Sequence, residues 1–354
     1  MAGTLVGPFL YLAASRPDPA EVTVMTRGAA YLLHHGTPYL PLGQLTSWTS
    51  YNPYLPLIDL LGLPRAAGLA APLGDPRVYT ALLTTALTAA AFALVTARPA
   101  GAPTAPGAED AGAAGAAGDS EPGRSADWAR VARLTAIGVT SPVIGFQLVL
   151  GITDPPIIAL TCLALACLSR GWLTRAAVVI AVASASKYTA WPLVPVFAVM
   201  AWARYSPGRA VRLTVTTLAA AAALALAAAP NALSDTASVA ANTLDYPLGL
   251  TKIKTVAASP LPGHLIASTG HAGHTIAVAL LLLAGLAFAA WLVLRPPRTQ
   301  RAVAIRLVVA YTAMFTLAPA TRYGYYIYPL ALLAWSFLSV PPDERQEPVR
   351  QEAR

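Results

Sequence analysis

The chain has 354 residues, of which 56% are hydrophobic and only 11% are charged. Soluble domains carry roughly 25% charged residues, so this composition excludes an ordinary soluble domain and predicts a membrane protein. The formal net charge of +8 does not indicate nucleic-acid binding, because the arginines occur in small groups between apolar segments, as the positive-inside rule predicts for cytoplasmic loops.

The amino-terminal part, residues 1–97, is expected to hold an incomplete first helix, a first outer loop and a second membrane helix. Residues 4–14 are apolar but too short to span a hydrocarbon core of ~30 Å, and no basic segment precedes them to indicate a cleavable signal peptide. Residues 18–41 have apolar side chains at helical spacing, Leu33 included, and this helical pattern ends at Gly36 and Pro38. They predict an amphipathic helix on the outer surface.

Residues 98–133 are rich in alanine, glycine and proline and lack core-forming side chains, so they predict a flexible cytoplasmic linker. The tail, residues 341–354, is also assigned to the cytoplasm. Further arginine-bearing loops at 170–175, 204–212 and 295–306 mark the same side of the membrane.

Residues 134–340 predict a transmembrane bundle with a large outer loop at 230–274. Three apolar segments, 134–169, 176–203 and 303–340, are too long for one crossing and have arginines at both ends, so each predicts a hairpin. The middle hairpin has short arms, and a re-entrant pair is the alternative there. The predicted fold is therefore all-α, a polytopic bundle of about ten crossings.

The three hairpin turns each carry one ionisable residue: Asp154 in GITDPP, Lys187 in SASKYTAWP and Arg322 in APATRYGYY. Charges near the hydrocarbon usually face a protein-lined cavity, so Lys187 and Arg322 are expected to hold an anion beside aromatic residues such as Tyr188. The alternative is that both cations only extend to the membrane surface. Asp154 is expected above all to cap the helix that continues through two prolines.

The second outer loop contributes weaker candidates. Lys252 and His264 are its polar candidates for ligand binding, although Lys252 could equally meet anionic head groups. His271 and His274 lack nearby cysteines and carboxylates, and the two cysteines lie inside one apolar segment. We therefore expect no metal site among these residues and no cofactor; a divalent cation is possible but is not supported by the sequence.

Several motifs occur in the order seen in one group of membrane enzymes. The first outer loop contains EVTVMTRGAAYLL, GTPYL and YNPYLPL, and the later helices contain GITDPPIIALTCLALA, SKYTAWPLVPV and RYGYYIYPLALL. Together these segments resemble polytopic glycosyltransferases of the GT-C superfamily, in particular the actinobacterial polyprenyl-phosphate-mannose-dependent mannosyltransferases of glycosyltransferase family 87. The resemblance covers most of the chain at low motif density.

This resemblance implies an integral membrane enzyme that moves a sugar, mannose in that family, from a polyprenyl-phosphate donor to a glycolipid or glycan on the extracytoplasmic side, with inversion. It implies a loop carboxylate as the general base. The family usually has aspartate there, whereas this chain has Glu21 at the aligned position and Asp18 three residues earlier, so both stay candidates. Lys187 and Arg322 would hold the phosphate, with Arg27 as a further candidate. The resemblance also implies that Lys252 and His264 could contact the lipid phosphate or sugar hydroxyls.

Two other functions are compatible with the sequence. A transporter or flippase would use Asp154, Lys187 and Arg322 to line a pathway, and an inactive scaffold descended from the enzyme would use them for stability. Transporters usually carry internal repeats and ionisable groups near the membrane midplane. We find no convincing repeat, which favours the enzyme. The expected partners are the lipid-linked donor, the acceptor and membrane lipids, and not nucleic acid.

Overall fold

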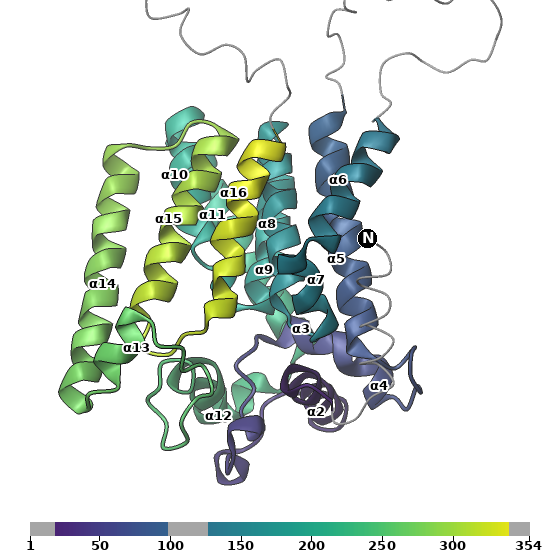
Figure 1. The fold of residues 1–354 in the computed structure, drawn as a ribbon, viewed down its shortest axis with the longest axis vertical. Coiled ribbons are helices and arrows are strands. Elements are labelled where there is room, and N and C mark those ends of the chain that lie inside the picture. The colour runs from purple at the N-terminus through teal and green to yellow at the C-terminus, as the bar shows by residue number, and fades with distance from the viewer. Residues whose placement is uncertain (1–17, 98–126, 340–354) are drawn as a thin grey trace, which may run out of the picture.

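The computed structural model describes residues 18–97 and 127–339 (Figure 1). This part of the chain is helical and contains no β-strand, apart from an isolated parallel bridge between Ala258 and Thr321. The predicted all-α class is therefore confirmed for these residues. The predicted first-helix stump at 4–14 and the predicted tail at 341–354 lie outside the described residues.

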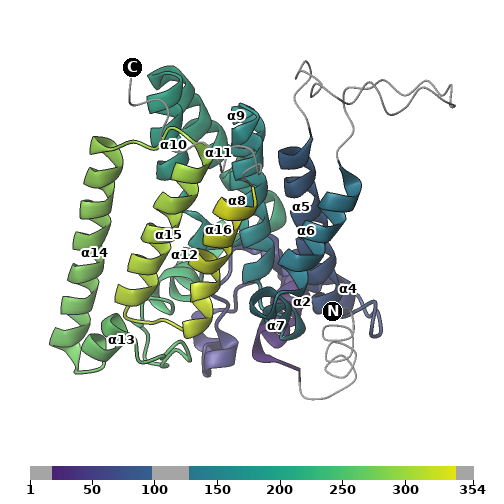
Figure 2. The ribbon, with the colours of Figure 1, turned by 45° about the horizontal axis from the view of Figure 1, so that its top comes forward.

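The bundle is built around α8 (Asp154–Ser169), which buries apolar side chains on all sides and so lies at the centre. The other long helices of the bundle are α5 (Pro76–Thr96), α6 (Trp128–Thr140), α9 (Leu173–Ser186), α10 (Leu193–Arg204), α11 (Pro207–Ala228), α14 (His271–Leu294), α15 (Gln300–Leu317) and α16 (Ile327–Leu338). In both views α14 lies at one edge and α5 and α6 lie at the other (Figure 2). Leucines of α14 point outward, as in a lipid-facing helix.

Three described helices, α5, α11 and α14, are long and apolar enough to cross a membrane. A fourth span results if α6 and α7 (Pro142–Val149), which meet at a bend of 64°, form one broken crossing. These spans indicate a membrane protein. The larger total of about ten crossings stays a prediction.

Each predicted hairpin segment folds back on itself, as α6 and α7 followed by α8, as α9–α10 and as α15–α16, and the turns lie at the lower end of the bundle in Figure 1. That these hairpins cross the membrane stays a prediction. The arms of the middle hairpin have 14 and 12 residues, or about 21 and 18 Å at 1.5 Å per residue. Both are shorter than a ~30 Å hydrocarbon core. Two crossings and a re-entrant pair both stay predictions for that hairpin.

The predicted amphipathic helix is α2 (Ala20–His35), which ends at Gly36 with a left-handed φ of 68°. Its buried face, with Val22, Met25 and Ala29, packs against the short helices α3 (Pro56–Asp59), η3 (Leu60–Gly62) and α4 (Leu63–Ala66). Leu33, expected on the apolar face, is 52% exposed. The location of α2 on the outer membrane surface stays a prediction.

Two predicted boundaries were wrong. The linker was expected to reach residue 133, but α6 begins at Trp128 because the Asp127 carboxylate caps it by accepting from the Arg130 amide. The outer loop was expected to reach residue 274, but α14 begins at His271. The remainder of that loop contains η5 (Ala232–Asp235), α12 (Thr236–Ala240), the π-helical turn η6 (Ala241–Asp245) and α13 (Pro262–Ala267).

Candidate functional site

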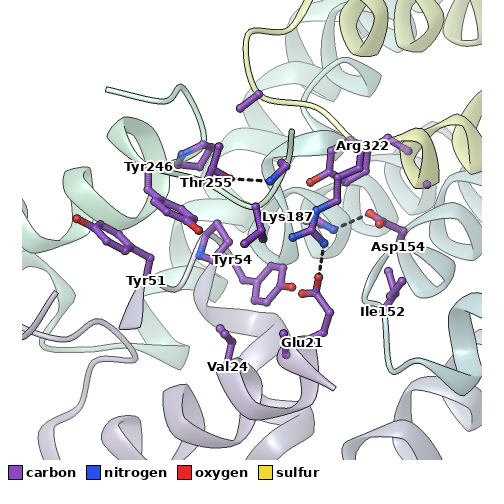
Figure 3. A pocket seen from close by; sticks show the side chains of 18 of the residues that line it. Glu21, Val24, Tyr51, Tyr54, Ile152, Asp154, Lys187, Tyr246, Thr255 and Arg322 are labelled. Atoms are coloured by element: carbon purple, nitrogen blue, oxygen red, sulfur yellow. Dashed lines mark hydrogen bonds and ion pairs between the residues drawn. The ribbon is translucent and has the colours of Figure 1, made fainter. Parts of the chain in front are cut away.

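A pocket lies where the three hairpin turns meet α2 and the two long loops (Figure 3). Its polar lining comes from Glu21 on α2, Asp154, Lys187 and Arg322 at the turns, and Tyr246 and Thr255 in the later loop. Tyr188, predicted beside the site, also lines it. The fold thus brings together five of the nine residues that the sequence singled out.

Lys187 is buried at the base of the pocket, with 4% of its surface exposed. It follows the last residue of α9 in an extended conformation. Its Nζ donates to Asp154 Oδ1 at 2.6 Å and to Thr153 Oγ1 at 3.2 Å, and the Tyr54 ring centroid lies 5.4 Å away. Asp154 therefore already balances the charge that was predicted to hold an anion.

Asp154 does not cap its helix, contrary to the sequence interpretation. It is the first residue of α8, and no side chain caps that helix. Its Oδ1 instead accepts from Lys187 and from the Tyr328 hydroxyl at 2.7 Å. The carboxylate thus connects α8 to the middle turn through Lys187 and to α16 through Tyr328. Leaving a buried ammonium without a counter-ion costs more free energy than leaving a helix end without a side-chain cap.

Glu21 and Arg322 form the more accessible ion pair of the pocket. Glu21 Oε1 lies 2.9 Å from Arg322 Nη1, and their side chains are 18% and 35% exposed. Burial lowers the pKa of Arg322, but the side chains of Tyr325, Glu21 and Tyr246 outweigh it and raise this pKa above its ordinary value. The pocket therefore presents one carboxylate beside one permanently charged guanidinium.

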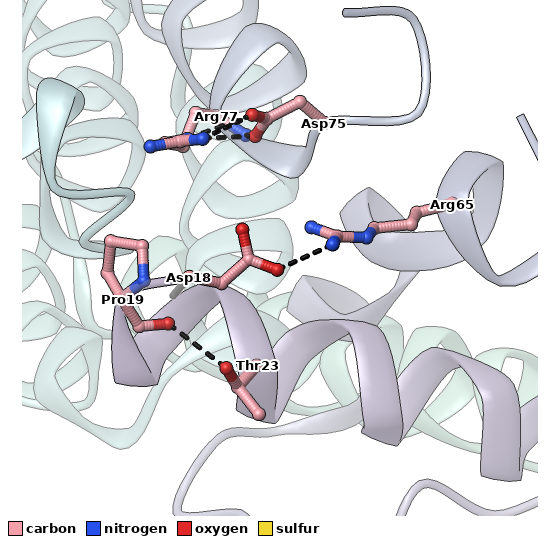
Figure 4. Close-up of polar contacts among 6 residues, drawn as sticks. All are labelled: Asp18, Pro19, Thr23, Arg65, Asp75 and Arg77. Atoms are coloured by element: carbon pink, nitrogen blue, oxygen red, sulfur yellow. Dashed lines mark hydrogen bonds and ion pairs between the residues drawn. The ribbon is translucent and has the colours of Figure 1, made fainter. Parts of the chain in front are cut away.

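Asp18, the other candidate base, does not line the pocket, and its carboxylate faces Arg65 instead (Figure 4). It precedes α2, and its Oδ2 pairs with Arg65 Nη2 of α4 at 2.5 Å. A separate buried pair, Asp75 with Arg77, lies at the start of α5. The geometry thus distinguishes the two carboxylates that the sequence left open.

Three other predicted residues also lie outside the pocket lining. Arg27 donates to the carbonyls of Thr49 and Tyr51 and so fixes the first loop. His264 Nδ1 lies 2.9 Å from the Pro319 carbonyl oxygen, which supports the third turn. Lys252 is exposed to solvent.

The aromatic side of the pocket was only partly predicted. Tyr51 and Tyr246 stack with ring centroids 4.3 Å apart, which joins the first loop to the second. Both side chains are buried and line the pocket. In the sequence, the segment YNPYLP (51–56) indicates an aromatic, proline-rich loop. Nothing in that pattern indicates that Tyr51 stacks with Tyr246 rather than with another tyrosine.

A buried polar network holds the first loop in place behind the pocket. Asn52 Nδ2 donates to both oxygens of Asp59 at 3.1 and 3.0 Å, and the Asn52 amide donates to Asn242 Oδ1 at 2.7 Å. Burial raises the pKa of Asp59 well above its ordinary value, opposed by the Asn52 hydrogen bond and the charge of Arg27. The network fixes the segment that carries Tyr51 and Tyr54.

Within residues 18–97 and 127–339, no three histidine, cysteine or carboxylate side chains lie close enough to hold a metal ion. Cys162 and Cys167 are free and buried in α8. In this aromatic-lined pocket the carboxylate can accept a proton, and the guanidinium beside it can bind an oxyanion. Compared with protein-family models, curated proteins and solved structures, the chain shows no match.

Proposed function

We propose that the protein is an integral membrane glycosyltransferase that transfers a sugar from a polyprenyl phosphate to a glycolipid or glycan of the cell envelope. The observation that carries the proposal is the Glu21–Arg322 pair in a pocket at one end of an apolar helical bundle. A general base and an oxyanion-binding group are the two functions that such a transfer needs, because phosphate is already a good leaving group.

In the proposed reaction, Glu21 removes the proton of the acceptor hydroxyl as its oxygen attacks the anomeric carbon. The bond between that carbon and the phosphate oxygen breaks, the electron pair stays on the phosphate, and the configuration inverts. Arg322 stabilises the charge that develops on the phosphate. Its guanidinium has five N–H donors, so donors remain for the phosphate while one contacts Glu21.

Lys187 has a different role in this proposal from Arg322. Its ammonium is paired with Asp154 and its position is fixed by Thr153. It shapes the base of the pocket and adds positive potential only if the Asp154 contact loosens. Arg322 is therefore the principal phosphate-binding residue.

An apolar cavity of about 220 Å³ beside the pocket supports a lipid-linked donor. It is lined by Ile144 of α7, Pro155 of α8 and Trp335 of α16. Pro155 directly follows Asp154, which lines the first pocket. An apolar cavity with a lining residue next to Asp154 in the chain suits a phosphate attached to a long hydrocarbon chain.

The proposal includes the topology inferred from the sequence: about ten crossings, with the pocket on the extracytoplasmic face and the arginine-rich ends in the cytoplasm. This orientation is supported by α9, which has Arg175 in its first turn and is followed by Lys187 at the pocket, so the two cations lie at opposite ends of the helix. Mannose as the sugar rests on the resemblance to family 87 alone.

The test is sugar transfer by the purified protein in nanodiscs, with radiolabelled polyprenyl-phosphate mannose and a lipid extract as the acceptor pool. Glu21→Gln should abolish transfer, whereas Asp18→Asn, the matched control three residues away, should keep it. Loss of transfer in Asp18→Asn alone would overturn the assignment of the base. Movement of the intact donor across the bilayer without transfer would favour the transporter.

A further inference from the structure

A second pocket lies at the opposite end of the bundle, between the start of α9 and the first turns of α11. Arg175 on α9 lines it together with Arg209 and Arg212 on α11. Arg175 and Lys187 are twelve positions apart, which corresponds to about 18 Å along a helix. This pocket is therefore separate from the candidate site.

The three arginines of this pocket differ from two others at the same end of the bundle, Arg170 and Arg306, whose guanidinium groups bond within the fold. Arg170 donates to the carbonyls of Leu94 and Ala97 at the end of α5, and Arg306 donates to the Arg295 carbonyl. In contrast, the guanidinium groups of Arg175, Arg209 and Arg212 make no hydrogen bond or ion pair with the described residues. Their hydrogen-bond donors are thus not used by this part of the fold.

The rest of the lining suits an anion with an apolar attachment. The Arg175 guanidinium carbon lies 4.1 Å from the centroid of the Trp172 ring, which holds its side chain against that ring. Thr174 and Thr216 add hydroxyl groups, and no acidic residue lines the pocket. α9 begins here without a side-chain cap, so the positive end of its dipole adds to the potential.

We infer that this pocket binds the phosphate of an anionic phospholipid. Arginine binds phosphate through two parallel hydrogen bonds, and three guanidinium groups from two helices surround the pocket. α11 is also a candidate membrane span whose side chains are mostly exposed, so the acyl chains of a lipid held here would lie along its apolar surface. The site is independent of the proposed transfer reaction.

The test is native mass spectrometry of the full-length protein in a neutral detergent, titrated with phosphatidylglycerol, phosphatidylcholine or inorganic phosphate. The triple variant Arg175→Gln, Arg209→Gln and Arg212→Gln should bind phosphatidylglycerol about a hundredfold more weakly. Each arginine near an anionic lipid strengthens binding by about fivefold, and the three factors multiply. The matched control removes the same charge outside the pocket, as Arg133→Gln, Arg298→Gln and Arg301→Gln. All six side chains are exposed, so both triple variants should fold.

The control triple should keep the wild-type affinity. An equal loss in both triples would mean attraction to a generally basic surface and would overturn the site. Equal binding of phosphatidylcholine would also overturn it, because the net negative charge of the lipid would then not matter. Displacement of the lipid by an equal concentration of inorganic phosphate would overturn the lipid assignment.

Discussion

Glu21 and Arg322 are 301 positions apart in the chain, and their side chains form an ion pair 2.9 Å long inside the pocket. The pair joins α2 to the turn between α15 and α16. It is also the pocket's more exposed pair, whereas Lys187 and Asp154 are almost completely buried. The two pairs should therefore respond differently to mutation.

Glu21→Gln should remove activity with little effect on stability. Partly exposed ion pairs contribute only about 0.2–1 kcal/mol, whereas loss of a general base lowers a rate by about 10²- to 10⁴-fold. The measurement is sugar transfer together with the thermal unfolding midpoint of the same detergent-purified sample. Asp18→Asn is the control for both. A large drop in the midpoint of Glu21→Gln would show that the pair serves the fold.

Lys187→Met and Asp154→Asn should each destabilise the protein by about 3–5 kcal/mol, because each leaves the partner charge or its hydrogen bonds uncompensated in a buried position. The double variant should lose less than the sum of the two. Denaturant unfolding of all four proteins in one detergent gives the coupling energy. Additive losses would mean that the two side chains do not depend on each other.

Much of the architecture could be predicted because hydrophobicity and charge alone determine it. Arginines bounded the apolar segments, the long segments had to turn, and the turns carried Asp154, Lys187 and Arg322. Gly36 ended α2 as expected, because a left-handed residue at a helix end favours glycine. The sequence thus identified which charged residues lie near the apolar region.

The pairing of those charges could not be predicted. Nothing in the pattern indicates that Lys187 meets Asp154 rather than an external anion, or that Arg322 reaches Glu21 on α2. The choice between Asp18 and Glu21 depends on where α2 begins and how it is rotated against α4. Such contacts depend on packing between distant segments, which one sequence does not encode locally.

Asp59→Asn should change how stability depends on pH. Burial raises the pKa of Asp59 well above its ordinary value in the folded protein, whereas an unfolded aspartate has a pKa of about 3.9. The Asp59 carboxyl group therefore binds its proton more tightly in the folded state than in the unfolded state. The resulting stabilisation is fully present below about pH 4 and is lost as the pH rises through the folded-state pKa.

The measurement compares the unfolding midpoints of wild type and Asp59→Asn in a pH series that starts near 4. The wild type should lose stability relative to the variant as the pH rises. A constant difference across the series would mean that Asp59 has the same pKa in both states. A difference that changes in the opposite direction would mean that the carboxylate is stabilised in its charged form.

Gly151→Ala should impair the site through α2. Gly151 has a φ of +72° in the turn before α8, and an added Cβ would lie 2.6 Å from Val22 Cγ2 and 2.9 Å from Arg77 Cγ. The backbone strain alone costs about 1–3 kcal/mol. Because Val22 follows Glu21 on α2, the clash should move the carboxylate, and a displacement near 1 Å can lower a rate by about a hundredfold.

The matched control is Gly285→Ala in α14, where an added Cβ meets no atom within 4 Å. Alanine is the better helix former by about 1 kcal/mol, so this variant should be as stable as the wild type or slightly more stable, with normal transfer. The measurement is the transfer rate at saturating donor, with the unfolding midpoint of each variant. If Gly151→Ala lowered the midpoint but left the rate unchanged, the turn would support the fold without positioning Glu21.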